Sequence, residues 1–249
     1  MTMRERRFLV TSLDDARIEL TGSQRHHAVD VLRLAIGADA TLFDGRGREV
    51  RAKVVGISAD HVTFERIEPP RDVHAARLPL ALAVATPKGA RADWLVEKCA
   101  EFGVSRLILI ETQRGEVHPG AGKLERWRRK AVEAAKQSGA AVVTRIEAGA
   151  TIDDICRDKS PGSALVFGAT DQSGIGFHAC LTRFGEAEPP IDGILCVIGP
   201  EGGLTDAEMD LLTSHGAAPV SLGRSILRVE TAAVAFAAVW AGFVGGDVE

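Results

Sequence analysis

The stretch that decides the fold runs from Ile194 to Glu208 and reads ILCVIGPEGGLTDAE. Its first five residues are apolar and predict a buried strand, and the proline and glycines after them predict a tight loop. Thr205 and Glu208 have the spacing of a capping box, so a helix is expected directly after the loop. Ligands of open α/β sheets bind just beyond the carboxyl ends of strands, which makes this loop a candidate binding site. A turn selected only for its geometry is the alternative interpretation.

The residues around this loop predict strands that alternate with helices. Apolar runs predict buried strands over residues 80–85, 104–110, 142–146 and 164–167, and a short strand that ends at Gly223. Helices are expected over residues 92–102, 124–138 and 232–244, and Gly103 is expected to end the first of them. Such alternation is typical of a mostly parallel sheet with helices on its faces.

The first 70 or so residues have a different pattern, which is rich in short β-prone segments. Strands are expected over residues 40–43, 49–55 and 61–67, with a turn at residues 44–47 (Asp-Gly-Arg-Gly). Residues 28–36 are apolar enough for a short helix or a strand, and their periodicity does not decide between the two. The polar, proline-containing residues 68–72 are the best linker candidate. We therefore expect two domains, residues 1–75 and residues 76–249.

Composition excludes several classes of protein. With 45% hydrophobic and 26% charged residues among 249, the chain has enough apolar material for a core, so global disorder is not expected. The four cysteines form no CxxC pair, which argues against a zinc ribbon or a disulfide scaffold and predicts free thiols and no metal site. The first residues lack the apolar core of a signal peptide. The longest uncharged run, residues 231–246, is short for a membrane span, so no membrane association is expected.

Charge is distributed unevenly along the chain. The net charge is −4 overall, but residues 78–147 carry +4 and residues 148–249 carry −9. The densest basic stretch, residues 123–130, contains Arg126, Arg128, Arg129 and Lys130. The solvated face of a helix explains this pattern, and contact with the phosphates of a nucleic acid explains it equally well.

A second loop follows one helix after the first and leads into the last helix. Arg228 and Glu230 stand just before that helix, where a plain ion pair could order the loop. The helix itself is rich in alanine and carries Phe236, Trp240 and Phe243. Packing in the core is the default interpretation of this apolar surface, and a dimer interface is the alternative.

Taken together, these motifs resemble one family, the ribosomal RNA small subunit methyltransferase E family of 16S rRNA uracil-N3 methyltransferases. The resemblance rests on residues 7–10 (RFLV), 26–27 (HH), 31–33 (VLR), 44–47 (DGRG), 88–89 (KG), 97–104 (EKCAEFGV), 127 (W), 135–138 (AKQS), 199–203 (GPEGG), 222–223 (LG) and 226–232 (ILRVETA). It covers nearly the whole chain. Ala140, Thr144 and Ser225 depart from the family pattern.

The resemblance implies a fold and a cofactor. The expected fold is an α/β SPOUT methyltransferase domain with a C-terminal trefoil knot, preceded by a small PUA-like β-barrel that binds RNA. General rules of chain topology would not predict a knot, so this expectation rests on the resemblance alone. The cofactor implied is S-adenosyl-L-methionine. Its expected binding residues are Phe167, Gly168, Ala169, Gly199, Pro200, Glu201, Gly202, Gly203, Leu222, Gly223, Ser225, Ile226, Leu227 and Thr231.

The resemblance also implies a reaction, which is methyl transfer to N3 of one uridine in 16S rRNA of the small ribosomal subunit. Arg228 is the candidate for stabilising the developing uracil anion, and Glu230 is the candidate base or the residue that orients Arg228. The side chains expected to contact RNA are Arg6, Arg7, Arg33, Arg114, Arg126, Arg129 and Lys130. Family members are usually homodimers, and a cytoplasmic location is expected.

Three alternatives stay open at this point. One is another SPOUT methyltransferase, acting on tRNA or on a ribose hydroxyl. Another is a non-catalytic RNA-binding factor for ribosome assembly that has kept the fold. The third is a small-molecule α/β enzyme, but the glycine loop is neither a P-loop nor a dinucleotide fingerprint, and no reactive nucleophile stands out.

Overall fold

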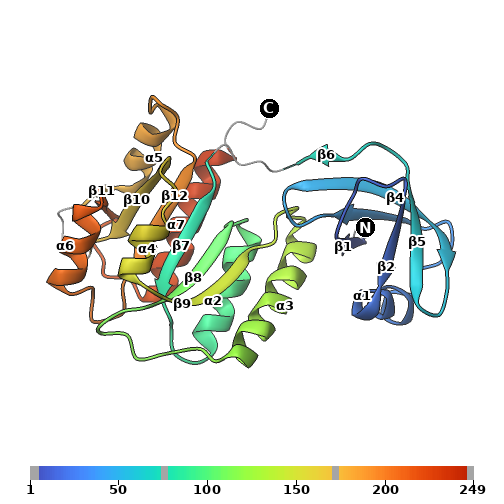
Figure 1. Ribbon diagram of the computed structural model, residues 1–249, viewed down its shortest axis with the longest axis horizontal. Helices are drawn as coiled ribbons and strands as arrows, with labels where there is room; N and C mark the ends of the chain where they lie inside the picture. Colours follow the sequence, from blue (N-terminus) through green and yellow to red (C-terminus); the bar gives the residue numbers. More distant parts are fainter. Residues whose placement is uncertain (1–5, 74–77, 170–173, 246–249) are drawn as a thin grey trace. The chain divides into compact units, whose positions relative to one another are not determined.

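The computed structural model describes residues 6–73, 78–169 and 174–245. Contacts divide the chain into two compact units (Figure 1). The first consists of residues 1–75 and 135–143, and the second of residues 76–134 and 144–249. The sequence predicted the boundary near residue 76 but not that residues 135–143 belong to the first unit. These residues lie far along the chain, and no sequence pattern links them to the first unit.

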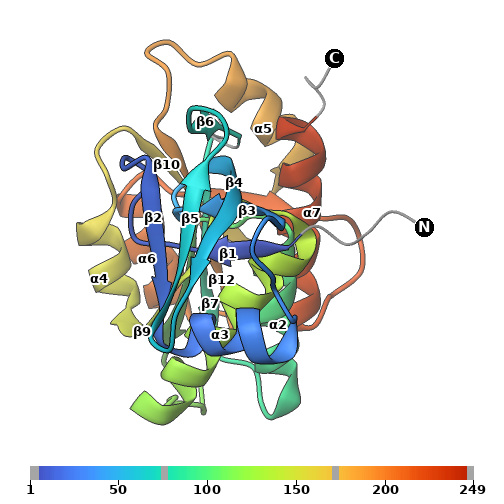
Figure 2. The ribbon, with the colours of Figure 1, turned by 90° about the vertical axis from the view of Figure 1, so that its right-hand side faces the viewer.

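A six-stranded sheet forms most of the first unit. Its strands are β1 (Arg7–Leu9), β2 (Arg17–Thr21), β3 (Asp39–Phe43), β4 (Arg48–Ile57), β5 (His61–Arg66) and β6 (Arg71–Asp72). The order is β1-β3-β4-β5-β2, with β6 paired to β4, and only the β1–β3 pair is parallel. Figure 2 shows β2, β5 and β4 side by side. The β-rich expectation for this region is confirmed, whereas the expected linker at residues 68–72 ends in β6 and therefore belongs partly to the sheet.

The apolar residues 28–36 form neither a strand nor a regular helix. A short helix α1 (Gly22–His26) continues into the π-helical turn η1 (His27–Val31). Ala28 and Leu34 are buried, but Val31, Leu32 and Ile36 are exposed. The segment therefore contributes little to the core, in which the rings of Phe8 and Phe64 lie 5.8 Å apart.

The turn between β3 and β4 is held by Asp44. Its Oδ1 accepts hydrogen bonds from the backbone N–H groups of Arg46 (2.8 Å) and Arg48 (3.2 Å). Burial acts to raise the pKa of Asp44, but these hydrogen bonds and the Arg48 guanidinium outweigh it, so the pKa is lowered. Residues 135–143 reach this turn through two backbone bonds, Gly47 N–H to the Ala141 carbonyl (3.1 Å) and Val143 N–H to the Gly45 carbonyl (2.9 Å).

The second unit contains a seven-stranded sheet in which every pair is parallel. Its strands are β7 (Leu80–Ala85), β8 (Arg106–Glu111), β9 (Arg145–Thr151), β10 (Ser163–Gly168), β11 (Ile175–Gly176), β12 (Gly193–Ile198) and β13 (Ala218–Ser221). The order is β11-β13-β10-β12-β7-β8-β9. The expected parallel sheet is confirmed. The strand expected over residues 142–146 begins later, because Val142 bridges to the turn of the first unit instead.

Helices cover both faces of this sheet. They are α2 (Ala90–Glu101), α3 (Ala121–Ser138), α4 (Ile152–Asp158), α5 (Phe177–Gly185), α6 (Asp206–Ser214) and α7 (Val229–Val244). Alternate strand residues such as Ile108, Phe167 and Val197 share one apolar cluster with α4 and α6. A Cβ on Gly168, one residue after Phe167, would instead lie 3.5 Å from Phe236 of α7. Helix α7 therefore covers the opposite face, where α2 and α5 contact it.

The last helix is an interior element of the second unit. Its Trp240 is buried, and the indole Nε1–H donates to the Leu78 carbonyl at 2.7 Å. Phe236 meets Phe177 of α5 edge to face, with ring centroids 4.7 Å apart. Among the described residues, no helix is both long enough and apolar enough to cross a membrane.

All four cysteines are free and buried. Burial raises the pKa of Cys99 to about 12 and that of Cys180 to about 11, and it also raises the pKa of Cys156 and Cys196. A thiol with so high a pKa is a poor nucleophile at neutral pH. The predicted free thiols are confirmed, and the cysteines are part of the core.

Candidate functional site

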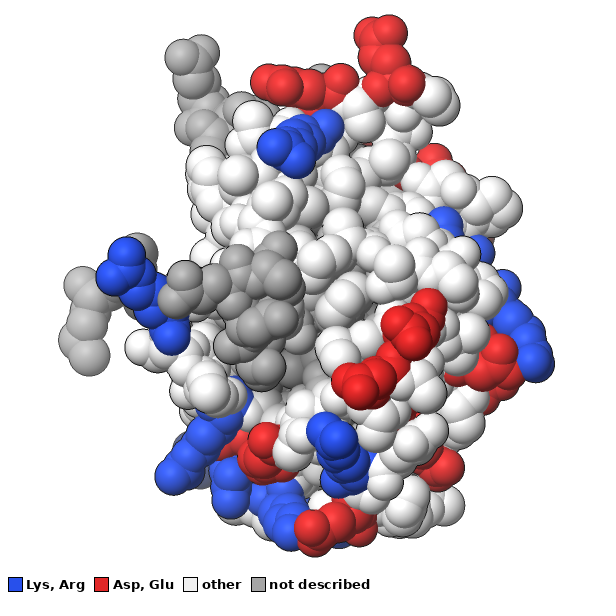
Figure 3. Space-filling model, turned by 90° about the vertical axis from the view of Figure 1, so that its left-hand side faces the viewer, with Lys and Arg blue, Asp and Glu red and all other residues white. Residues whose placement is uncertain are grey.

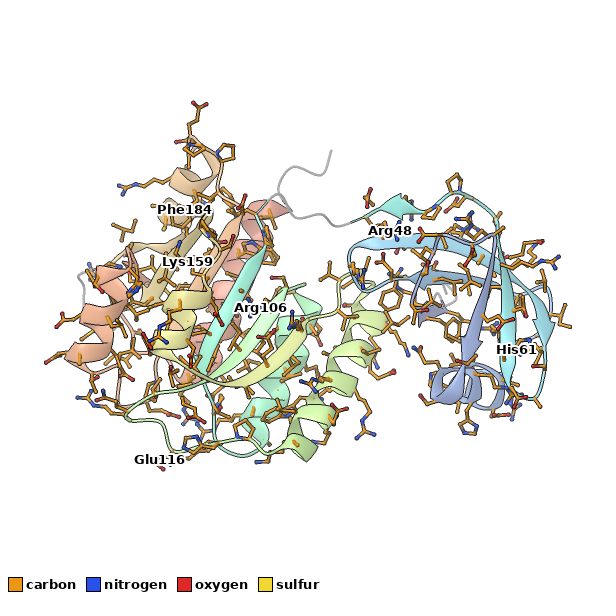
Figure 4. The ribbon with its side chains drawn as sticks, viewed as in Figure 1. Arg48, His61, Arg106, Glu116, Lys159 and Phe184 are labelled. Carbon is orange, nitrogen blue, oxygen red and sulfur yellow. The ribbon has the colours of Figure 1, made fainter. Side chains whose placement is uncertain are left out.

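The candidate site lies at the edge of the second sheet where its parallel strands end. Strands β10, β12, β7 and β8 are neighbours in that order, so the loops that follow them emerge at the same edge. Figure 4 labels Glu116, in the long segment after β8, at this edge. The segments that follow β7, β8, β10 and β12 are distant in sequence, and the sheet brings them to the same edge.

The glycine loop (residues 199–205) follows β12 and has a fixed backbone. A Cβ on Gly199 would lie 2.9 Å from Cγ of Leu204, which leaves no room for a side chain. Gly203 has a φ of 72° and its N–H bonds to the Pro200 carbonyl at 2.8 Å, so the loop closes in a conformation that favours glycine. The predicted capping box is confirmed, because the Thr205 N–H donates to Glu208 Oε2 at 2.8 Å and the Glu208 N–H donates to Thr205 Oγ1 at 3.3 Å.

The segment after β8 is bonded directly to the glycine loop. The Arg114 guanidinium donates to the carbonyl oxygens of Gly202 at 2.7 Å and Leu204 at 3.3 Å. The buried Glu208 accepts a further bond from the Gln113 N–H at 2.9 Å. Arg114 was expected to contact RNA, but these bonds assign part of its guanidinium to holding the glycine loop.

Glu230, in the first turn of α7, pairs with an arginine that the sequence did not single out. Its Oε1 lies 3.7 Å from Nη1 of Arg91 on α2, and the same nitrogen lies 3.6 Å from Glu201 Oε1 in the glycine loop. Glu230 is 6% exposed, and its Oε2 has no hydrogen-bond partner in the described part of the chain. The suggested Arg228–Glu230 ion pair is therefore replaced by an Arg91–Glu230 pair. No sequence spacing links residue 91 to residue 230, so pattern analysis had no signal for it.

Arg228 is the N-terminal flanking residue of α7 and has an exposed side chain. Within the described ranges it takes part in no ion pair. It lines a cavity of about 450 Å³ between the glycine loop and the segments after β7 and β8. The polar side chains that line this cavity with it are Thr86, Lys88, Arg91, Arg114, Glu116 and Glu201.

The residues expected to bind the cofactor come from three neighbouring loops. Phe167, Gly168 and Ala169 end β10, which lies between β12 and β13 in the sheet. The Ala169 N–H bonds to the Val220 carbonyl at 2.9 Å, which ties the end of β10 to β13. The loop after β13 contains Leu222, Gly223, Ser225, Ile226 and Leu227, and Thr231 lies in the first turn of α7. The fold thus places all three predicted segments at one edge of the sheet.

The residues expected to contact RNA fall into different environments, beginning with Arg7. It is 9% exposed, its Nη1 lies 2.8 Å from Glu49 Oε2, and its guanidinium sits over the Phe43 ring at 5.3 Å. A buried, paired guanidinium is a structural element of the first unit, so the expectation for Arg7 is corrected. Arg6 is half-buried, and Arg33 is exposed with an unusual φ of 50°.

The basic stretch on α3 is largely paired with acids of α2. Arg126 lies 2.6 Å from Asp93, and Lys130 lies 2.5 Å from Glu97. The hydrogen bond from Lys130 is the main cause of a lowered pKa for Glu97. Arg129 is exposed. Much of this charge therefore joins α3 to α2, and among the described residues Arg129 is the one of the three candidates without an ion pair.

Comparisons with known proteins identify the family. A family model described as an RNA methyltransferase domain matches residues 74–241, and one described as an RNA methyltransferase PUA domain matches residues 20–65. The chain is 32% identical over 227 residues to the ribosomal RNA small subunit methyltransferase E of Synechocystis sp., covering 88% of this chain and 70% of that protein. The chain belongs to the ribosomal RNA small subunit methyltransferase E family. The resemblance inferred from the motifs is confirmed.

Further relatives of this family extend the match. The ribosomal RNA small subunit methyltransferase E of Bacillus subtilis is 29% identical, covering 86% of this chain and 85% of that protein. A solved methyltransferase structure from Legionella pneumophila, which contains the cofactor SAM, is 26% identical with a TM-score of 0.76 and covers 96% of this chain and 97% of that chain. A solved ribosomal RNA small subunit methyltransferase E from Neisseria gonorrhoeae, bound to S-adenosyl methionine, is 24% identical with a TM-score of 0.79 over 94% and 95% of the two chains.

These matches confirm the expected α/β SPOUT-type fold and the PUA-like region near the N-terminus. The knot, the individual site residues and the dimer stay predictions. Among the described residues, no group of three or more His, Cys, Asp or Glu side chains is arranged to hold a metal ion.

Proposed function

We propose that this protein transfers a methyl group from S-adenosyl-L-methionine to N3 of a uridine in 16S rRNA, within the small ribosomal subunit. Family membership supports RNA methylation. The observation that carries the finer proposal is the position of Arg228, an exposed cation without an ion-pair partner in the described structure, at the rim of a cavity beside the glycine loop. A substrate of the small subunit also implies that the protein works in the cytoplasm.

The loops after β10, β12 and β13 fit the proposed cofactor. They present backbone groups at one edge of the sheet, and glycines at 199, 203 and 223 keep side chains out of their turns. Gly223 has a φ of 121° with open space beyond its missing Cβ, so a ligand can approach the backbone there. When bound, S-adenosylmethionine supplies a methyl group on a positively charged sulfur, which needs no metal for its transfer.

The residues of this chain then have to orient the uracil and stabilise its charge. Neutral uracil is a poor nucleophile, so N3 must lose its proton, and negative charge develops on the ring. Arg228 is suited to stabilise that charge, because it sits on the first residue before α7 and its guanidinium is not neutralised by a described carboxylate.

Glu230 is better suited to positioning than to proton removal. Its side chain is 6% exposed and is not among the residues that line the cavity beside Arg228. Its contact with Arg91 joins the start of α7 to α2, and Arg91 also faces the glycine loop. Through these contacts Glu230 fixes the helix end from which Arg228 projects.

RNA binding by this protein is proposed to involve both units. The PUA-like region offers Arg6 and Arg33, and α3 offers Arg129 with Arg126 and Lys130 beside it. Contacts of this kind go to phosphates and add affinity without reading sequence.

The test of the proposed function is the variant Arg228→Ala. We expect methylation of purified small ribosomal subunits to fall by about 100-fold or more, because one preorganised cation opposite the developing charge is lost. Calorimetric titration with S-adenosylmethionine should give a dissociation constant within about twofold of the wild type, since RT ln 2 is below 0.5 kcal/mol. A collapse of cofactor affinity would mean that Arg228 is structural. Methylated-nucleoside analysis of the product RNA would show whether the base is 3-methyluridine, and any other base would contradict the proposed target.

A further inference from the structure

The N-terminus of α2 lies beside the cavity, and no side chain caps it. The residue before the helix is Gly89, with φ 65° and ψ −139°. The first N–H groups of a helix have no partner within the helix, and the helix dipole adds positive potential there. An end of this kind favours an anion. Lys88 and Arg91, on either side of this start, both line the cavity.

Basic side chains outnumber acidic ones around this cavity. Four cations line it, Lys88, Arg91, Arg114 and Arg228, against two carboxylates, Glu116, which pairs with Lys88, and Glu201, which faces Arg91. Basic side chains also gather along the lower edge of the face shown in Figure 3, with acidic ones interspersed.

The ion pairs of Arg91 leave donors available for a ligand. Its distances to Glu201 and Glu230 are 3.6 and 3.7 Å, longer than the 2.7–2.9 Å typical of a direct charge-assisted hydrogen bond. The Arg91 side chain is also 42% exposed. An incoming anion can therefore bond to this guanidinium without first breaking a short pair.

The hydroxyl of Thr86 is a second feature of this cavity that suits an anionic ligand. Thr86 directly follows β7 and lines the cavity, and its Oγ1 is buried with no hydrogen-bond partner in the described part of the chain. A buried hydroxyl without a partner costs free energy, and a bound oxygen atom would satisfy it.

We propose that this cavity binds a phosphate group of the RNA backbone next to the target uridine, through Lys88, Arg91, the Thr86 hydroxyl and the N-terminus of α2. This inference rests on the proposed function, because it places the phosphate where the flipped nucleotide would meet the cofactor loops. Pro200, Glu201 and Gly202 form both a wall of this cavity and part of the expected cofactor site. A phosphate held here would fix the backbone on one side of the glycine loop while the base reaches Arg228.

The carboxylate of the cofactor's methionine part is a competing anion for the same cavity. The two ligands are distinguished by which affinity changes when the cations are removed. Loss of RNA affinity with unchanged cofactor affinity supports the proposal that the cavity binds an RNA phosphate. Loss of cofactor affinity with unchanged RNA affinity assigns the cavity to the carboxylate and overturns the proposal.

The experiment compares three variants of the full chain with the wild type. Lys88→Gln/Arg91→Gln removes both cations, and Thr86→Val removes the hydroxyl at nearly constant shape. Lys98→Gln is the matched control, because Lys98 lies at the other end of α2 and pairs only with Glu97 and Glu101 among its described contacts. Affinity for a single-stranded, uridine-containing RNA oligonucleotide is measured by fluorescence anisotropy at several salt concentrations. Affinity for S-adenosylmethionine is measured by calorimetry.

We expect the double variant to bind RNA about tenfold more weakly or worse. The slope of log affinity against log salt should fall by about 0.7 for each lost contact with a single strand. Thr86→Val should weaken RNA binding less and leave the salt slope unchanged, because it removes no charge. Cofactor affinity should stay within about twofold of the wild type in all variants.

RNA affinity and salt slope equal to those of Lys98→Gln would overturn the proposal, and so would an absence of RNA binding by the wild type. Thr86→Val keeps the test decisive if the double variant does not fold. Failure of the wild type to methylate small subunits would instead contradict the proposed function, while the RNA-binding comparison would still show whether the cavity holds a phosphate.

Discussion

Glu230 places a carboxylate in the interior of the second unit, and its surroundings explain how the fold tolerates it. A buried charge is costly unless it is paired and hydrogen-bonded. Arg91 supplies the pair, and the first turn of α7 places the carboxylate at the positive end of the helix dipole. The charge is therefore stabilised by two elements whose relative position it also fixes.

At the residue scale, Glu230→Gln is expected to slow methylation by about 10- to 100-fold, because an isosteric amide keeps the fold but loses the attraction to Arg91. Single-turnover rates measured from pH 6 to 9 test the assigned role. If Glu230 positions Arg91, the rate of the variant is lower at every pH, but its dependence on pH has the same shape as that of the wild type. Loss of the rising limb of the profile in the variant would show that Glu230 is the base.

Ion pairs between residues distant in sequence are the residue-level features that the sequence did not predict. Arg7 pairs with Glu49 and Arg91 with Glu230, and both arginines were either assigned elsewhere or overlooked. The periodicity of apolar residues predicts which face of a helix or strand is buried, but a single charged residue has no periodicity that predicts its partner. Only the fold shows which distant carboxylate it meets.

Among the structural elements, those with strong local signals were predicted well. Strands β7, β10 and β12 are runs of apolar residues and lie within a residue of their expected positions. The short helices α4 and α5 were missed. Helices of seven and nine residues are marginal on their own and owe their stability to packing and caps, which a pattern search does not see.

The conformation of the glycine loop determines which of its positions can carry a side chain. Gly199→Ala should destabilise the protein by about 1–3 kcal/mol, because its Cβ would overlap Leu204 and force the loop to move. It should also weaken the binding of S-adenosylmethionine.

Gly202→Ala is the matched comparison, because its Cβ would meet only the Arg114 side chain at an ordinary 3.4 Å. Thermal melting and calorimetric titration of both variants check the contrast. Equal effects of the two substitutions would show that the loop adapts more freely than its geometry indicates.

At the scale of the whole molecule, the apolar last helix agrees with the default interpretation of the sequence, packing in the core, and not with the alternative of a dimer interface. Phe236 and Trp240 pack inside the second unit, so the core uses most of this face. The expected homodimer has to use other surface. Ile226, in the loop before α7, is 78% exposed and is the most exposed large hydrophobic side chain described.

We therefore expect the wild type to sediment at twice the chain mass of 26.5 kDa, and Ile226→Asp to shift it toward the monomer. A charge in a closed apolar interface opposes association because it must lose its water. Sedimentation velocity over a range of concentrations gives the answer. A monomeric wild type would show that the homodimer prediction is wrong for this chain.

Because residues 135–143 belong to the first unit, that unit cannot complete its folding as soon as its first 75 residues have been synthesised. When residue 75 leaves the ribosome, the hairpin at Gly45 and Gly47 still lacks the backbone partners supplied by Val143 and Ala141. Those partners are synthesised only after β7, α2, β8 and the whole of α3. Domains generally fold as units during synthesis, the N-terminal one first. Here the N-terminal unit reaches its final contacts only after residues 76–134 of the second unit have been translated, so neither unit is a separable module of the nascent chain.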